Sequence, residues 1–93
     1  MITTVILSDR AKKDLKKAPV QVRDKLAVWI VSVSEIGLAE VRKVPGYHDE
    51  PLKWERKGQR SIRLSLQWRA IYVIAKDGAL EFVSVEEITP HKY

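Results

Sequence analysis

The residues best suited to chemistry lie between positions 50 and 69, in the stretch EPLKWERKGQRSIRLSLQWR. Its six basic and two acidic residues give a charge of +4, out of +5 for the whole chain. The run SIRLSL alternates between polar and apolar residues, so Arg63 should lie on the opposite face of a strand from Ile62, Leu64 and Leu66. Cationic side chains held on a sheet suit a phosphate backbone, and a merely solvated sheet face is the alternative. The basic residues are Lys53, Arg56, Lys57, Arg60, Arg63 and Arg69.

The composition of the whole chain limits the classes of function. Ninety-three residues with 45% apolar content predict a single domain, residues 1–93, with one modest core. The net charge of +5 favours an anionic partner, which could be nucleic acid, an acidic protein or a membrane surface. Because the chain has no cysteine and only two histidines, His48 and His91, we expect no disulfide, no thiol catalysis and no metal site.

The distribution of apolar residues bears on location. No apolar run approaches the ~18 residues of a membrane span. The apolar run at the N-terminus is too short for a signal peptide, and its charges follow the run instead of preceding it. We therefore expect a cytoplasmic protein with no membrane partner and no cofactor.

The first half of the chain predicts one strand and two main helices. Residues 2–7 are β-branched and apolar, as in a strand, and Ser8 can cap the helix that follows. Pro19 should end that helix and begin a second one over residues 20–36, where apolar residues recur at steps of three and four. Gly37 should stop the second helix, and residues 38–44 are expected to form a short third one. The surplus apolar surface of the second helix could pack on a sheet or seat a partner.

The second half predicts a sheet. Strands are expected at 52–56, 61–66, 70–75 and 80–88, with a hairpin turn at 76–78. In the last strand Leu80 and Phe82 are expected to point inward, with Val83 and Val85 as further candidates. Trp54 and Trp68 are expected in the core, although either could stack on a base. The order of elements predicts an α+β fold, a curved antiparallel sheet with the N-terminal helices packed on one face and the arginines on the helix-free face.

Three segments carry a resemblance to a known family: EPLKWERKGQRSIRL, QWRAIYVI and the terminal TPHKY. Their shared pattern is PLK, a basic turn containing glycine, then S-I-R, then W-R before an apolar strand. On these segments the whole chain resembles the RelE/ParE superfamily of bacterial type II toxins, especially its RelE, YoeB and HigB branches. The resemblance implies a small RelE-like domain.

The same resemblance implies an activity and two partners. It implies an mRNA endoribonuclease that works in the A site of the 70S ribosome and inhibits translation. The ribose 2′-OH attacks the adjacent phosphorus without a metal, leaving a 2′,3′-cyclic phosphate and a free 5′-OH. A cognate antitoxin protein would bind the enzyme and silence it.

The resemblance also implies roles for single residues. Glu50 stands where YoeB-like toxins have a glutamate as general base and HigB-like toxins a histidine, and His48 is the alternative base. Arg69 resembles the arginine that clamps the transition state, since a guanidinium can hold two phosphoryl oxygens. The residues suited to binding RNA are Lys53, Arg56, Lys57 and Lys92, together with Arg60 and Arg63, which could serve either purpose.

The C-terminal residues would complete the reaction. Toxins of this family often end with histidine and tyrosine near the site, one of them acting as general acid. His91 is the natural acid because imidazole titrates near neutral pH. Tyr93 is the other candidate, because this chain ends in histidine-lysine-tyrosine whereas the YoeB and HigB tails end in tyrosine-histidine order.

Two other functions fit the same sequence. A ParE-like inhibitor of DNA gyrase would share the fold but leave RNA intact, and a nucleic-acid-binding module would bind without cleaving. The joint occurrence of Glu50, Arg69 and His91 argues against the gyrase inhibitor, because such proteins generally lack this set.

Overall fold

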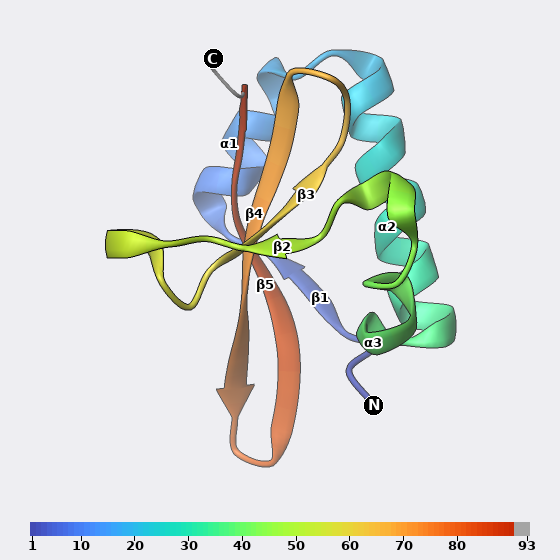
Figure 1. The fold of residues 1–93 in the computed structure, drawn as a ribbon, viewed down its shortest axis with the longest axis vertical. Coiled ribbons are helices and arrows are strands. Elements are labelled where there is room, and N and C mark those ends of the chain that lie inside the picture. The colour runs from blue at the N-terminus through green and yellow to red at the C-terminus, as the bar shows by residue number, and fades with distance from the viewer. Residues whose placement is uncertain (91–93) are drawn as a thin grey trace.

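A computed structural model describes residues 1–90, so the predictions for His91, Lys92 and Tyr93 lie outside the described residues. Along the sequence, a short first strand is followed by the helices, and the other four strands come after them (Figure 1). The elements are β1 (Val5–Leu7), α1 (Asp9–Lys17), α2 (Val20–Ile36), α3 (Leu38–Val41), the 3₁₀ turn η1 (Pro45–Tyr47), β2 (Glu50–Pro51), the 3₁₀ turn η2 (Trp54–Arg56), β3 (Arg60–Arg63), β4 (Trp68–Asp77) and β5 (Leu80–Pro90).

The strands form one open sheet in the order β1-β5-β4-β3-β2. Neighbours from β2 to β5 are antiparallel, as predicted, whereas β1 pairs with β5 in parallel. The predicted α+β class is confirmed. The sheet is mixed and not purely antiparallel, because β1 runs parallel to its neighbour β5. In Figure 1 the β4–β5 hairpin projects beyond the helices. Its turn falls at Gly78 and Ala79, so it shares only Gly78 with the predicted turn at 76–78, and Lys76 and Asp77 still belong to β4.

The helices begin and end where the sequence places them. The Ser8 hydroxyl accepts a hydrogen bond from the backbone N–H of Ala11 at 3.0 Å, which caps α1. Pro19 separates α1 from α2, and Gly37 stops α2 with a positive φ of 85° that glycine adopts without strain. The third helix is shorter than predicted and ends at Val41.

The core lies between the helices and one face of the sheet. Trp29 of α2 is fully buried, and its ring centroid lies 5.5 Å from that of Tyr72 in β4. Burying a large apolar side chain stabilises a fold by about 2–3 kcal/mol, so this layer is the main source of stability. The buried residues of α1, α2 and the link between them are Ala11, Ala18, Val22, Leu26, Trp29 and Val33, and α3 adds Leu38 and Val41. The buried sheet residues in the same core include Ile62, Ala70, Tyr72, Val83, Val85 and Ile88. The expectation that Leu80 and Phe82 fill the core is wrong, since Leu80 is exposed and Phe82 only partly buried.

Three further predictions for the sheet region are wrong. The expected strand at 52–56 is a two-residue strand, Glu50–Pro51, followed by a 3₁₀ turn, because Trp54 has a positive φ of 61° that breaks extended structure. Trp54 is 86% exposed instead of lying in the core, whereas Trp68 packs against the core as expected. Leu66 is 73% exposed because β3 already ends at Arg63.

A β-bulge in β5 decides which of its residues face the helices. Tyr72 pairs with Val85, but its neighbour Ile71 pairs with Glu87, so Glu86 is the extra residue. Val85 and Ile88 therefore both point into the core, while Glu87 and Thr89 turn to the helix-free face. Ser8 holds the bulge: its hydroxyl donates to the Glu86 carbonyl at 2.8 Å, and its backbone N–H donates to the Val85 carbonyl at 2.9 Å.

Ser8→Ala should therefore destabilise the protein more than an ordinary helix cap substitution. The change removes the cap of α1, which typically costs about 1 kcal/mol, and also the hydroxyl donor to the Glu86 carbonyl, worth about 1 kcal/mol more. Urea unfolding of the variant should report the loss. Ser34→Ala is the matched control, since the Ser34 hydroxyl donates to the Val31 carbonyl in the same helix, on its exposed side. Equal stability of the two variants would contradict a role of Ser8 in holding the bulge.

Candidate active site

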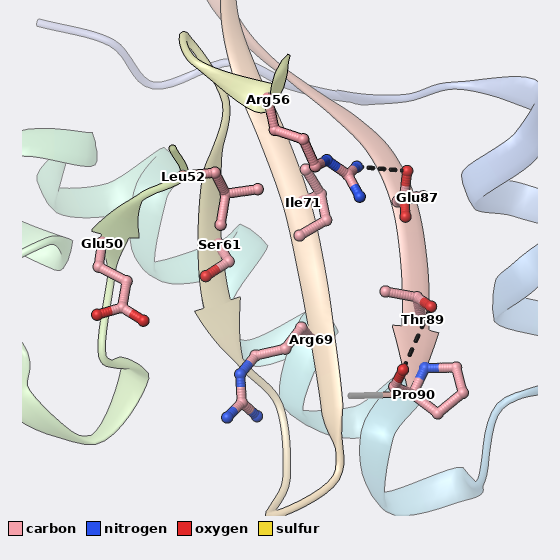
Figure 2. Close-up of a pocket in the computed structure, with 9 residues that line it drawn as sticks. All are labelled: Glu50, Leu52, Arg56, Ser61, Arg69, Ile71, Glu87, Thr89 and Pro90. Atoms are coloured by element: carbon pink, nitrogen blue, oxygen red, sulfur yellow. Dashed lines mark hydrogen bonds and ion pairs between the residues drawn. The ribbon is translucent and has the colours of Figure 1, made fainter. Parts of the chain in front are cut away.

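The helix-free face of the sheet carries a cavity of about 360 Å³ near the paired ends of β2 to β5 (Figure 2). Four strands and η2 contribute side chains to it, so its shape depends on contacts between distant parts of the sequence. We call this cavity the cleft. Its lining residues are Glu50, Leu52, Arg56, Ser61, Arg69, Ile71, Glu87, Thr89 and Pro90.

The register of the strands brings Glu50 and Arg69 into the same cleft. Glu50 pairs with Ser61 of β3, and Arg69 lies on β4, on the other side of β3. Adjacent strands are ~4.8 Å apart, so the two backbones are separated by roughly 10 Å, a gap that two long side chains can reach across. Figure 2 shows Glu50 on β2 and Arg69 on β4, on either side of the end of β3. Among the described residues Glu50 forms no ion pair.

Two arginines face each other directly at this end of the cleft. Arg63 of β3 and Arg69 of β4 are cross-strand partners, so their side chains leave the same face side by side. The Arg69 guanidinium is held by the carbonyls of Ser65 and Trp68, at 3.1 and 3.2 Å from Nη1. The Nε atom of Arg63 is buried and has no hydrogen-bond partner among residues 1–90. Like charges in directly opposed positions destabilise a sheet, so this pair favours an anion between or beside its members.

A carboxylate that the sequence analysis did not single out lies at the other side of the cleft. Glu87 accepts a hydrogen bond from Arg56 at 2.7 Å, and Arg10 of α1 approaches the same oxygen at 3.6 Å. The Glu87 side chain is only 12% exposed. Arg56 thus reaches from η2 across the cleft to β5, as Figure 2 shows. The bulge that turns Glu87 to this face leaves no signal in the sequence.

A second buried carboxylate anchors the segment that carries Glu50. Asp49, whose side chain is 1% exposed, accepts from Arg60 Nε and from the Tyr72 hydroxyl, each at 2.6 Å. Burial and the hydrogen bond and charge of Asp49 raise the pKa of the Tyr72 hydroxyl far above its usual value. Burial by itself lowers the pKa of Arg60, but the hydrogen bond and charge of Asp49 outweigh it and raise that pKa. These bonds fix the residue before Glu50 to the core face of the sheet.

The sequence-derived candidates therefore fall into distinct places. Glu50, Arg56 and Arg69 line the cleft, and Arg63 lies beside Arg69 on the same face. Arg60 lies on the opposite, core-facing side, in register with Tyr72, and is bound to Asp49. His48, the alternative base, is not among the residues that line the cleft. Lys53 and Lys57 are exposed on the segment between β2 and β3 and line a separate groove with Trp54.

Two further structural properties concern residues 1–90. No helix in this part of the chain is both long and apolar enough to cross a membrane. No three histidine, aspartate or glutamate side chains gather there in an arrangement that could hold a metal ion.

Comparison with solved structures identifies the fold. A chain of the E. coli DinJ–YafQ toxin–antitoxin complex superposes with a TM-score of 0.71 at 22% identity, over 97% of this chain and 94% of that one. A YoeB/ParE toxin from Agrobacterium tumefaciens gives a TM-score of 0.68 at 17% identity, over 96% and 99% of the two chains. A chain of the YoeB–YefM complex from Staphylococcus aureus gives a TM-score of 0.68 at 18% identity, over 96% and 97%.

At the level of sequence, no protein-family model matches the chain, and no curated protein matches it. The structural neighbours are under 25% identical, so what they have in common with this chain is the fold. The chain shares its fold with YoeB and YafQ toxins, which confirms the fold that the resemblance implied.

The raised pKa of Tyr72 makes stability depend on pH in alkaline solution. In the unfolded chain this hydroxyl loses its proton near its ordinary pKa of 10.0, while in the folded protein it stays protonated. The unfolded state therefore binds fewer protons above pH ~10, and the free energy of unfolding should fall as pH rises. Tyr72→Phe should be less stable at pH 8, by about 1–3 kcal/mol for a lost bond to a carboxylate, but lose less stability between pH 8 and 11.

Urea unfolding at a series of pH values measures this effect. Tyr47→Phe is the comparison variant, because burial raises the pKa of Tyr47 as well but no bond to Asp49 contributes. A Tyr72→Phe protein whose stability falls with pH as steeply as that of the parent would contradict the assignment.

Proposed function

We propose that this chain is the toxin of a type II toxin–antitoxin system and acts as an endoribonuclease on mRNA in the ribosomal A site. The observation that carries the proposal is the cleft, which is lined by both Arg69 and Glu50, a carboxylate without an ion-pair partner among residues 1–90. Arg63, the cross-strand partner of Arg69, lies beside it on the same face. A base and paired cations on one rigid face are what cleavage of a phosphodiester by its own 2′-OH requires. The shared fold with YoeB and YafQ toxins supports the same reading.

The proposed reaction assigns one task to each group. Glu50 takes the proton from the ribose 2′-OH, whose oxygen then attacks the adjacent phosphorus. Arg69 and Arg63 stabilise the extra negative charge of the five-coordinate phosphorane. The bond from phosphorus to the 5′ oxygen breaks, and that oxygen takes a proton from a general acid. The products are a 2′,3′-cyclic phosphate and a free 5′-OH.

We assign the acid to His91, with Tyr93 as the alternative. Pro90, the residue before His91, lines the cleft, and so does Thr89. The chain therefore lines the cleft immediately before the segment that contains His91 and Tyr93. Neutral imidazole and imidazolium are both present near pH 7, which suits a group that must donate a proton in each turnover.

The cationic surface also supports the proposed partners. Arg63 and Arg69 on the cleft face, with Lys53 and Lys57 beyond β2, suit ribosomal and messenger RNA phosphates. An acidic segment of a cognate antitoxin could occupy the same surface by charge complementarity. The YafQ neighbour was crystallised in a toxin–antitoxin complex, which supports a partner of this kind. Working on ribosomes would place the protein in the cytoplasm.

Arg69→Lys should reduce the rate of cleavage by about 10²–10³-fold at saturating substrate, because lysine keeps the charge but loses the planar fork that holds two oxygens. The measurement is single-turnover cleavage of mRNA on purified ribosomes, with the cut positions mapped by primer extension. Arg23→Lys is the matched control, an exposed arginine on α2 remote from the cleft. A near-parental rate for Arg69→Lys would remove Arg69 from the site.

Glu50→Gln should reduce the same rate by about 10²–10⁴-fold, since the amide cannot accept the 2′-OH proton. The exposed Glu35 of α2 provides the control Glu35→Gln. Because Glu50 is exposed and forms no ion pair among the described residues, the variant should unfold at the parental urea concentration. If the parent cuts no mRNA but blocks supercoiling by DNA gyrase, the protein is a gyrase inhibitor and the ribonuclease proposal fails.

A further inference from the structure

The segment between β2 and β3 presents an exposed tryptophan at its tip. In Figure 1 this yellow-green segment projects from the side of the molecule opposite α2. Trp54 is 86% exposed and has a positive φ of 61°. Bulky residues rarely adopt positive φ, and large aromatic side chains are rarely left in water, so Trp54 departs from two folding preferences at once. Such departures persist where the surrounding structure enforces them and are concentrated at functional sites.

The backbone around Trp54 is held rigidly. Leu52 donates to the Gln59 carbonyl at 2.9 Å, which closes the base of the segment. Within it, the Lys57 N–H donates to the Trp54 carbonyl at 3.1 Å. Arg56 donates to Gln59 within the segment and to Glu87 of β5, each at 2.7 Å, and the second bond ties the segment to the sheet. The backbone that carries the exposed indole is therefore held by hydrogen bonds at both ends of the segment.

The surroundings of Trp54 are apolar and cationic. The indole lines a groove of about 420 Å³ together with Lys53 and Lys57, and no carboxylate is among the lining residues. Leu52 lines both this groove and the cleft, so the two hollows are neighbours just after β2. A strand whose phosphate lay in the cleft could continue into the groove. An aromatic face with cations beside it is the combination that binds an unstacked nucleobase and its phosphate.

We propose that Trp54 is a stacking platform for a nucleobase of the single-stranded RNA that enters the cleft, with Lys53 and Lys57 contacting the phosphates next to that base. The inference rests on the proposed function for the identity of the strand. It adds a binding subsite outside the catalytic cleft, and it accounts for both the exposure of Trp54 and its backbone conformation.

The test uses binding without cleavage. A fluorescein-labelled 2′-O-methyl oligoribonucleotide has no 2′-OH nucleophile, and a second probe of the same length carries abasic residues in place of the bases. Fluorescence anisotropy at low salt gives the dissociation constant of each. Trp54→Ala should weaken binding of the intact probe by about 10- to 100-fold, as for a lost base–aromatic stack, and leave the abasic probe unchanged. Trp54→Phe should retain most of the affinity.

Three comparison variants separate stacking from other effects. Lys57→Ala should weaken both probes alike and reduce the salt dependence, since it removes a phosphate contact. Val28→Ala changes another exposed apolar residue, on α2, and should leave both constants unchanged. Trp54→Gly should melt at the parental temperature or above, because glycine tolerates the positive φ, and yet bind the intact probe as weakly as Trp54→Ala. Binding loss in a variant of undiminished stability excludes unfolding as its cause.

The outcomes also distinguish this inference from the proposed function. If Trp54→Ala binds the intact probe as tightly as the parent, or loses both probes equally, the stacking subsite is overturned even where mRNA is cut. If the parent cuts no mRNA but its binding of bases depends on Trp54, the ribonuclease proposal fails and the subsite stands. If Trp54→Ala affects only the binding of an acidic polyglutamate peptide, the groove is a protein-binding surface and the inference is overturned.

Discussion

The hydroxyl group of Ser8 is the contact on which much of the site depends. It accepts from the first turn of α1 and donates to the carbonyl of Glu86, the extra residue of the β5 bulge. Without the bulge, the alternation of β5 would place Glu87 and Thr89 in the core and leave Ile88 outside. Asp14 of α1 strengthens the arrangement by accepting from the backbone N–H of Ile88 at 3.0 Å. One helix thus determines which side chains of a neighbouring strand reach the cleft.

The acids around the cleft are divided into those with and those without a cationic partner. Asp49 is bound to Arg60 on the core side of the sheet, and Glu87 is bound to Arg56 at the rim. Among residues 1–90 Arg63 and Arg69 have no acidic partner, and neither has Glu50. The bound acids fix the elements that carry the unpaired groups. The unpaired groups keep their charge available to a ligand. This costs stability, because the like charges of Arg63 and Arg69 repel each other across the two strands.

Sequence patterns predicted the parts of the fold that local physics controls. The 3.6-residue period identified α2, and Ser8, Pro19 and Gly37 marked the ends of helices because each acts within one or two turns. The parallel pairing of β1 with β5 and the bulge at Glu86 were not predictable, since both arise from contacts between residues about 80 positions apart. In β5 apolar residues occur at both even-numbered and odd-numbered positions. The alternation therefore could not show whether Val83 and Val85 or Leu80 and Phe82 face the core. The sequence therefore suggested Glu50 and Arg69 for the site, but neither Glu87 nor the exposure of Trp54.

The departures from folding preference converge on one surface. Opposed arginines occur at the paired ends of β3 and β4, and a tryptophan at positive φ occurs in the segment that leads from β2 to β3. Either alone would be a local irregularity. Leu52 lines both the cleft and the groove that Trp54 lines, so the two irregularities lie near each other on the surface. Sequences generally satisfy local and global preferences together, and violations concentrate where function requires them. A chain of phosphates with bases that can unstack would relieve the charge repulsion and cover the indole at the same time.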